Sequence, residues 1–113
     1  MATSPEYSEN APTRAEIDAL EGPAVLEFGT AWCGFCQAAR PLVEQAFTGH
    51  PGVRHLRIED GPGRLLGRSF RVKLWPTLIF LEHGKEVKRL VRPADAAAIR
   101  EALAGIDPAA DRS

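Results

Sequence analysis

Apolar residues gather in two short uninterrupted runs, residues 24–29 (AVLEFG) and residues 77–82 (TLIFLE). Runs of this length, bounded by Gly and Pro, predict buried strands. In residues 53–58 the set Val53, His55 and Arg57 alternates with the set Arg54, Leu56 and Ile58, which predicts another strand but leaves its buried face open. Residues 86–91 predict a fourth strand, which follows the short turn at residues 83–85 (HGK).

Helical patterns lie between and around these strands. Thr13 and Glu16 form a T-x-x-E capping box, which predicts a helix over about residues 14–20. The other expected helices cover residues 33–48 with Gly49 as a left-handed cap, about residues 63–71, and a last segment from Pro93 at its first position to Gly105.

The order of these elements predicts an α/β fold with one mixed sheet of four or five strands and helices on both faces. Alternating strands and helices favour parallel pairing, and the short turn favours one antiparallel pair. We expect a single domain over residues 13–106, a flexible N-terminal arm at residues 1–12 and a flexible C-terminal tail at residues 107–113.

Composition narrows the class of protein. The 113 residues are 44% hydrophobic and 26% charged, which fits one globular domain that folds without metal or disulfide staples. The net charge of −1 argues against nucleic acid as a partner. No apolar run approaches the roughly 20 residues that a membrane span needs, and the N-terminus does not resemble a signal peptide. We therefore expect a cytoplasmic protein without a membrane partner.

The two cysteines, Cys33 and Cys36, follow the first predicted strand and open the helix after it. At a helix N-terminus, free amides and the helix dipole favour a thiolate. A thiolate at Cys33 can attack a disulfide, and Cys36, one turn along, can resolve the mixed disulfide. This spacing at a strand-to-helix turn is a redox signature.

Two other interpretations of the cysteines remain. The pair could be structural. It could also bind zinc together with His50 and His55, because 13 residues separate Cys36 from His50. The zinc interpretation is weak, since the cysteines open a helix and glycine and proline surround His50. We therefore expect no metal site.

The sequence resembles the thioredoxin family over about residues 13–105. The resemblance rests on Trp32-Cys33-Gly34-x-Cys36, on Pro41 inside the following helix, on Pro76-Thr77 before the second apolar run, and on Glu27. It implies a thioredoxin fold and a monomeric thiol–disulfide oxidoreductase that reduces protein disulfides. No bound cofactor is implied, because the dithiol carries the electrons. A flavin- and NADPH-dependent donor of the thioredoxin-reductase type is implied.

The resemblance also gives roles to single residues. Cys33 is the nucleophile and Cys36 the resolving thiol. Glu27 accepts the proton of Cys36, with a pKa raised by burial, although an edge-facing or salt-bridged Glu would fit the pattern too. Pro76 forms a cis peptide, positions the substrate backbone at Trp75 and keeps metals from the thiols; an ordinary proline at a strand start is the alternative.

A substrate-docking surface is expected around the thiols, formed by Trp32, Gly34, Phe35, Trp75 and Arg92. Alternatively, the two tryptophans pack on each other and shield the disulfide. Phe35 replaces the family's usual proline, which predicts a more oxidising pair. Trp75 and Arg92 also depart from the family pattern and could block general substrates. The alternative function is therefore a binding or scaffold module with regulatory cysteines.

Basic residues are concentrated in residues 53–92, which hold 10 basic and 4 acidic side chains. Arg64, Arg68 and Arg71 lie at helical spacing and either attract an acidic partner or form a solvated face. The histidines are expected at the surface or in turns. His55 has a second interpretation, a position near the buried acid that makes proton transfer sensitive to pH.

Overall fold

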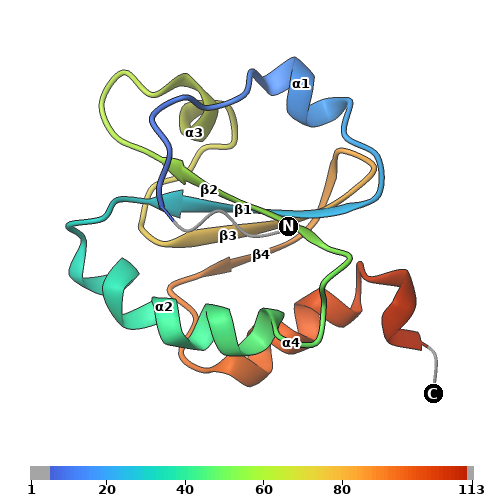
Figure 1. Cartoon of the computed structure of the whole chain (residues 1–113). Helices are drawn as coiled ribbons and strands as arrows, with labels where there is room; N and C mark the ends of the chain where they lie inside the picture. The colour runs from blue at the N-terminus through green and yellow to red at the C-terminus, as the bar shows by residue number, and fades with distance from the viewer. Residues whose placement is uncertain (1–5, 112–113) are drawn as a thin grey trace.

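The computed structural model describes residues 6–111, which form a four-stranded mixed sheet between two layers of helices (Figure 1). The strands are β1 (Pro23–Gly29), β2 (Arg54–Glu59), β3 (Thr77–Glu82) and β4 (Lys85–Val91). Their spatial order is β2-β1-β3-β4. β1 pairs parallel with β2 and antiparallel with β3, and β3 pairs antiparallel with β4. The mixed sheet that the sequence predicts is confirmed.

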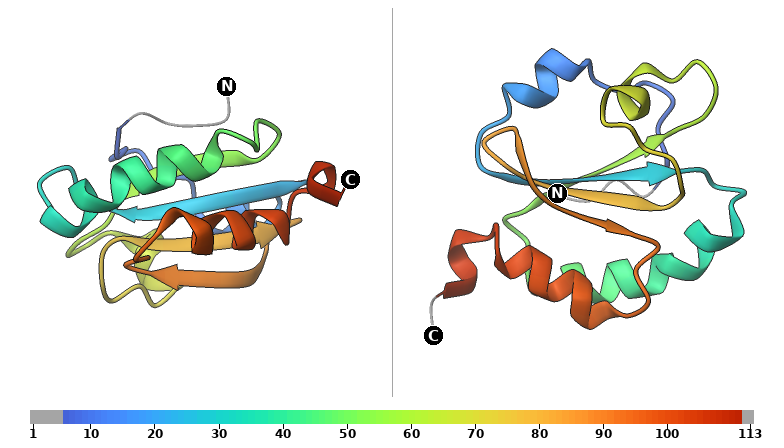
Figure 2. Two further views of the ribbon diagram at one scale, coloured as in Figure 1. Left: turned by 90° about the horizontal axis from the view of Figure 1, so that it is seen from below. Right: turned by 180° about the vertical axis from the view of Figure 1, so that it is seen from behind.

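The helices cover both faces of the sheet, as predicted (Figure 2). They are α1 (Arg14–Asp18), α2 (Gly34–Phe47), α3 (Leu65–Ser69) and α4 (Ala96–Ala104), followed by the 3-10 helix η1 (Pro108–Asp111). One apolar cluster joins α2 and α4 to the sheet through Val25, Val43 and Leu103. The other joins α1 and α3 to its opposite face through Ile17, Leu26 and Leu66. Each run of apolar strand residues therefore contributes side chains to both hydrophobic clusters, one on each face of the sheet.

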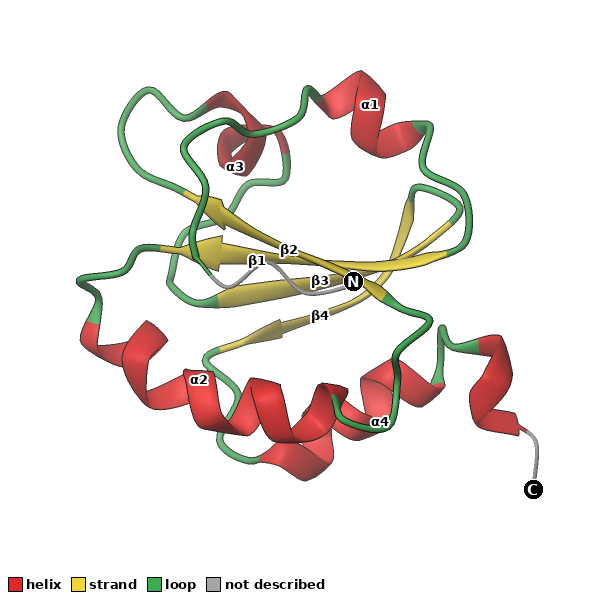
Figure 3. Cartoon of the chain, in the orientation of Figure 1, coloured by secondary structure: helices red, strands yellow, loops and turns green. Residues whose placement is uncertain are grey.

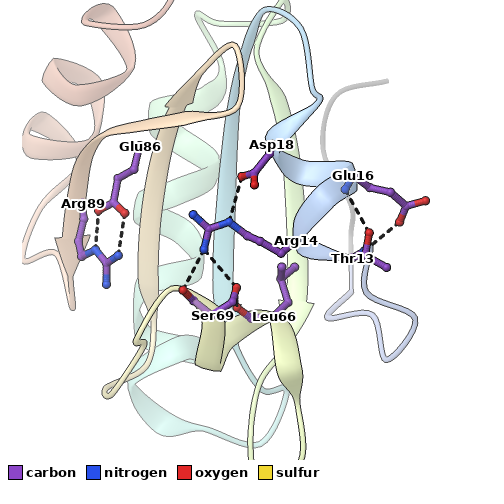
Figure 4. Close-up of polar contacts among 8 residues, drawn as sticks. All are labelled: Thr13, Arg14, Glu16, Asp18, Leu66, Ser69, Glu86 and Arg89. Carbon is purple, nitrogen blue, oxygen red and sulfur yellow. Dashed lines mark hydrogen bonds and ion pairs between the residues drawn. The ribbon is translucent and has the colours of Figure 1, made fainter.

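Side chains at the start of α1 fix this helix to α3 (Figure 4). The capping box is present: the Glu16 amide donates to Thr13 Oγ1, and the Thr13 amide donates to Glu16 Oε1. Arg14 donates to Asp18 one turn along and to the carbonyl of Ser69 at the end of α3. Its guanidinium also lies 3.8 Å from the centre of the Phe70 ring.

Two expected helix ends are wrong. The last helix begins at Ala96, not at Pro93, because Asp95 is its N-cap and accepts a hydrogen bond from the Ala98 amide. Asp side chains cap helices better than the preceding proline can. Gly49 is not among the residues with positive φ, and α2 ends at Phe47 with Thr48 as its C-cap in the right-handed helical region.

Residues near both ends of the described chain contact the domain, whereas η1 projects beyond α4 (Figure 3). Ser8 forms a parallel bridge to Ile58 at the outer edge of β2. Asp107 is buried, and its carboxylate lies 2.6 Å from His50 Nδ1. The flexible arm and the flexible tail stay predictions, and within them Ser8 and Asp107 make these contacts with the domain. The remaining expectations for residues 1–5 and 112–113 lie outside the described residues.

Within residues 6–111, no helix combines the length and the apolar character that crossing a membrane would require.

Candidate active site

Cys33 and Cys36 lie where β1 passes into α2, at one end of the sheet (Figure 1). Cys33 is the N-cap of α2, and its Sγ accepts a hydrogen bond from the Cys36 amide at 3.3 Å. Both thiols are free and both side chains are buried, Cys36 more deeply at 3% exposure against 8% for Cys33. The sequence predicted this placement, and it allows the two sulfurs to exchange one disulfide bond.

The Cys36 thiol is held as a thiol by its surroundings. Burial and the hydrogen bond with Cys33 raise the pKa of Cys36 to about 11. The Thr30 backbone and the Tyr7 hydroxyl act against this and lower the same pKa by hydrogen bonding. A thiol in this state needs help to lose its proton before it can act as a nucleophile.

Glu27 is buried at 1% exposure and sits in a closed polar network. Its Oε1 accepts hydrogen bonds from His55 Nε2 at 2.7 Å and from Arg57 Nε at 3.2 Å. Its Oε2 accepts the Tyr7 hydroxyl at 2.7 Å. Burial alone would raise the pKa of Glu27, but His55, Arg57 and Tyr7 together hold it below its ordinary value.

The expectation of a raised pKa for Glu27 is therefore wrong, and its salt-bridged alternative describes the geometry. The reason is the strand register, in which Glu27 lies opposite Arg57 on the face of the sheet that α2 covers. His55 is buried at 1% exposure, so its expected surface position is also wrong and its position beside the buried acid is correct. His50 pairs with Asp107, and His83 lies exposed in the turn, where its Nδ1 accepts from the Gly22 amide.

Pro76 follows Trp75 through a cis peptide bond, as expected. The Trp75 carbonyl is not open: it accepts a hydrogen bond from Arg92 Nε at 2.8 Å. The Arg92 guanidinium also lies 3.7 Å from the centre of the Phe35 ring. Arg92 therefore spans from the end of β4 to the first turn of α2, across the backbone that the sequence assigned to substrate binding.

The aromatic side chains around the thiols combine both expected arrangements. Trp32 packs edge-on against Trp75 with ring centres 5.7 Å apart, yet it remains 74% exposed. Phe35 is 57% exposed. Trp75 is half-buried and donates from Nε1 to Asp60 Oδ2 at 2.9 Å. A Cβ added to Gly34 would meet no atom within 4 Å, so the surface between the two cysteines is open.

The histidines do not join the cysteines. His55 is bonded to Glu27 and His50 to Asp107, so the spacing that suggested zinc does not bring the four side chains together. Among residues 6–111, no group of three or more His, Cys, Asp or Glu side chains could hold a metal ion.

Sequence reasoning missed Tyr7 and Arg57. Arg57 carried a signal, because a buried acid in one strand requires a partner and a basic residue lies at alternate spacing in the next strand. Tyr7 carried none, since it stands in a polar segment without periodicity and reaches the site through the bridge of Ser8 to Ile58.

Comparison with known proteins agrees with this geometry. A family model described as Thioredoxin matches residues 6–105. Thioredoxin of Mycobacterium tuberculosis is 32% identical over 89 residues, which cover 76% of this chain and 75% of that protein. The bifunctional thioredoxin reductase/thioredoxin of Mycobacterium leprae is 28% identical over 97 residues, which cover 83% of this chain and 21% of that protein.

The similarity to a solved structure extends over most of both chains. Thioredoxin 2 from Pseudomonas aeruginosa, in its reduced form, superposes with a TM-score of 0.82 and 56% sequence identity. The alignment covers 89% of this chain and 94% of that one.

Proposed function

Since this chain belongs to the thioredoxin family and is a thiol–disulfide oxidoreductase, we propose that it works in the reducing direction on disulfides of partner proteins. The observation that carries the proposal is the free thiol pair Cys33–Cys36 at the start of α2. The dithiol supplies two electrons in each cycle and requires no bound cofactor.

The exchange begins at Cys33, the more exposed of the two sulfurs. Its thiolate attacks one sulfur of the substrate disulfide, a Cys33–substrate bond forms, and the first substrate sulfur leaves and takes up a proton. Cys36 then loses its proton and attacks the Cys33 sulfur. The Cys33–Cys36 bond forms, and the second substrate sulfur leaves as a thiol, so the substrate gains two electrons and two protons.

Substrate binding is assigned to the surface formed by Trp32, Phe35 and Trp75 with the open backbone at Gly34. Two of these aromatic side chains are more than half exposed, which suits contact with a protein. Arg92 must release the Trp75 carbonyl before an extended substrate chain can pair with it. Arg92 is therefore a specificity-determining residue as well as a docking residue.

A basic hollow next to this surface supports an acidic partner segment. The hollow has a volume of about 430 Å³, reaches from Trp75 to α3, and is lined by Asp60 and by the basic side chains of Arg64, Arg68, Arg71 and Lys73. Arg68, Arg71 and Lys73 are exposed. Their summed field attracts a negatively charged segment to the edge of the thiol site.

The proposed electron donor is a reductase of the thioredoxin-reductase type. Support comes from the Mycobacterium leprae relative, whose name joins thioredoxin reductase and thioredoxin in one chain. Such a donor reduces the Cys33–Cys36 disulfide and completes the cycle.

The test is reduction of insulin disulfides with NADPH and a thioredoxin reductase. We expect NADPH oxidation that depends on this protein and that is lost in Cys33→Ser and in Cys36→Ser. Turnover by Cys33→Ser at the wild-type rate would overturn the assigned nucleophile. If dithiothreitol supports insulin reduction and the reductase does not, the proposed donor is wrong.

One observation favours a second function, a binding module with regulatory cysteines: Arg92 already occupies the Trp75 carbonyl. A stable complex with a partner protein that survives Cys33→Ser, together with absent insulin reduction, would support this alternative over the enzyme.

A further inference from the structure

Tyr7 lies between the resolving thiol and the buried carboxylate. Its hydroxyl donates to Glu27 Oε2 at 2.7 Å, and this hydroxyl and the Cys36 sulfur both border the space beside Gly29. The other oxygen of Glu27 is taken by His55 and Arg57. Tyr7 therefore lies between Cys36 and Glu27, the two groups between which a proton moves in the resolving step.

The backbone fixes Tyr7 in this place. The amide of Ser8 donates to the Arg57 carbonyl at 3.0 Å, and the amide of Glu59 donates to the Ser8 carbonyl at 2.9 Å. Gly29 leaves the necessary space on β1: a Cβ at this position would lie 2.5 Å from Cys36 Sγ and 2.9 Å from the Tyr7 hydroxyl oxygen. The Cys36 sulfur and the Tyr7 oxygen therefore lie in the space that a side chain larger than that of glycine would occupy.

Charged and titratable groups approach this contact from every neighbouring element. β1 contributes Glu27, β2 contributes His55 and Arg57, and α2 contributes Cys33. A cavity of about 200 Å³ is lined by Tyr7 and Cys36 and by the exposed residues Glu6 and Gln37, with Arg40 and Arg57 also at its wall. Solvent can reach the contact through this cavity, away from the docking surface.

We propose that Tyr7 is a positioning residue through which Glu27 acts on Cys36 in the resolving step. The Cys36 proton moves to the Tyr7 oxygen while the Tyr7 proton moves to Glu27 Oε2. The electron pair left on Cys36 forms the bond to Cys33, and the Cys33–substrate bond breaks with its electrons on the substrate sulfur. That sulfur takes up a proton, and Glu27 returns its proton through the Tyr7 hydroxyl, which lines the cavity, to solvent. The inference rests on the proposed exchange cycle.

His55, Arg57 and Tyr7 hold the pKa of Glu27 below its ordinary value, so the carboxylate is ionised and accepts the hydrogen bond from Tyr7. Burial and the neighbouring Glu27 charge raise the pKa of Tyr7, so its hydroxyl stays neutral and remains a donor.

The experiment follows the two release steps of 5,5′-dithiobis(2-nitrobenzoate) with the reduced protein by stopped-flow absorbance. The first thionitrobenzoate leaves when Cys33 attacks, and the second leaves when Cys36 resolves the mixed disulfide. For Tyr7→Phe we expect an unchanged first phase and a second phase slowed about tenfold or more, with its pH midpoint moved upward. Ser8→Ala, a neighbour in the same segment, is the control and should leave both phases unchanged.

Two further measurements keep the inference falsifiable if Tyr7→Phe does not fold. Tyr7 is the only tyrosine of the chain, so growth on fluorotyrosine changes this phenol alone and should shift the pH profile of the second phase. Glu27→Gln should slow the second phase, and the double variant Tyr7→Phe/Glu27→Gln should be no slower than the slower single variant.

A second phase that keeps its rate and pH profile in Tyr7→Phe or with fluorotyrosine overturns the inference. Effects that multiply in the double variant overturn it too, because Tyr7 and Glu27 would then act separately. Loss of the first phase in the wild-type protein would instead contradict the proposed exchange cycle.

Discussion

Arg92 offers the sharpest test of how substrates reach the thiols. Its Nε donates to the Trp75 carbonyl at 2.8 Å, and its guanidinium stacks 3.7 Å from the centre of the Phe35 ring. Its own φ is 50°, a left-handed conformation that glycine adopts without strain. Arg92→Gly therefore removes the side chain that covers the carbonyl and leaves the backbone conformation favourable.

The size of the effect follows from what a substrate must displace. A hydrogen bond from a charged donor contributes about 1.5–3 kcal/mol, and an exposed cation–π contact about 0.5–1 kcal/mol. Because Arg92 is exposed, water replaces part of both contacts when they break. Displacing Arg92 from the Trp75 carbonyl therefore costs a substrate about 1–2 kcal/mol of binding free energy. That corresponds to a KM lowered about five- to thirtyfold.

The assay measures KM and kcat for an uncharged peptide disulfide, with dithiothreitol as the donor. We expect Arg92→Gly to lower KM and leave kcat unchanged, since neither cysteine is touched. Lys88→Ala is the matched control, because it removes an equal charge from an exposed position of β4, the strand that Arg92 follows. An unchanged KM would refute the competition at Trp75, and a raised KM would make Arg92 a direct substrate contact.

Other predictions address packing, charge and acid stability. Gly29→Ala should lower the free energy of unfolding in urea by about 1–3 kcal/mol because its Cβ meets Cys36 Sγ, whereas Gly49→Ala, which meets no atom within 4 Å, should change it little; equal effects would contradict the packing argument. The kcat/KM for an acidic peptide disulfide should fall with rising salt in the wild type, and this dependence should weaken in Arg68→Ala/Arg71→Ala; an unchanged dependence would exclude the basic hollow. A hydrogen bond from His50 holds the pKa of Asp107 below its ordinary value, so its stabilisation is complete above that value and is lost as pH falls through the lower folded pKa. Asp107→Asn should therefore flatten this part of the acid dependence of unfolding, at a cost near neutral pH of about 1 kcal/mol, and a curve parallel to the wild type would refute the assignment.

Local sequence signals were sufficient for much of the fold. The capping box at Thr13 starts α1, and the apolar run at residues 77–82 coincides with β3. The turn expected between the last two strands forms at His83-Gly84, because both residues adopt the positive φ that a tight hairpin turn requires. The position of the two cysteines at the start of α2 was also predicted correctly, because the apolar run of β1 and the helical pattern after it locate the junction between them.

The buried polar network was harder to predict, because it depends on register and on distant chain segments. Glu27 was identified as unusual, but its ionisation depends on Arg57 and His55, which lie on the same face of the neighbouring strand. The alternation in β2 left this face undecided, since apolar Ile58 is buried together with both polar residues. A pattern with two buried faces has no periodic signature.

The contacts of Tyr7 and Arg92 could not be predicted from local sequence signals either. Tyr7 reaches the site through backbone hydrogen bonds of Ser8 to β2, which leave no trace in side-chain periodicity. Arg92 was identified as a docking residue, yet its bond to Trp75 depends on where β4 ends beside Pro76, whose carbonyl accepts from the Arg92 amide. Both contacts are set by tertiary geometry and not by local sequence preference.

The most direct test of the central claim is the midpoint potential of the Cys33–Cys36 pair. We would equilibrate the protein in thiol–disulfide buffers, trap free thiols and count them by mass. Thioredoxin has a potential of about −270 mV, and a strong dithiol oxidant of the same kind of chemistry about −120 mV. We expect a value nearer to the first than to the second, raised above the first by Phe35 in place of proline. A value close to the second, or a pair that forms no disulfide at any buffer potential, would contradict a protein-disulfide reductant.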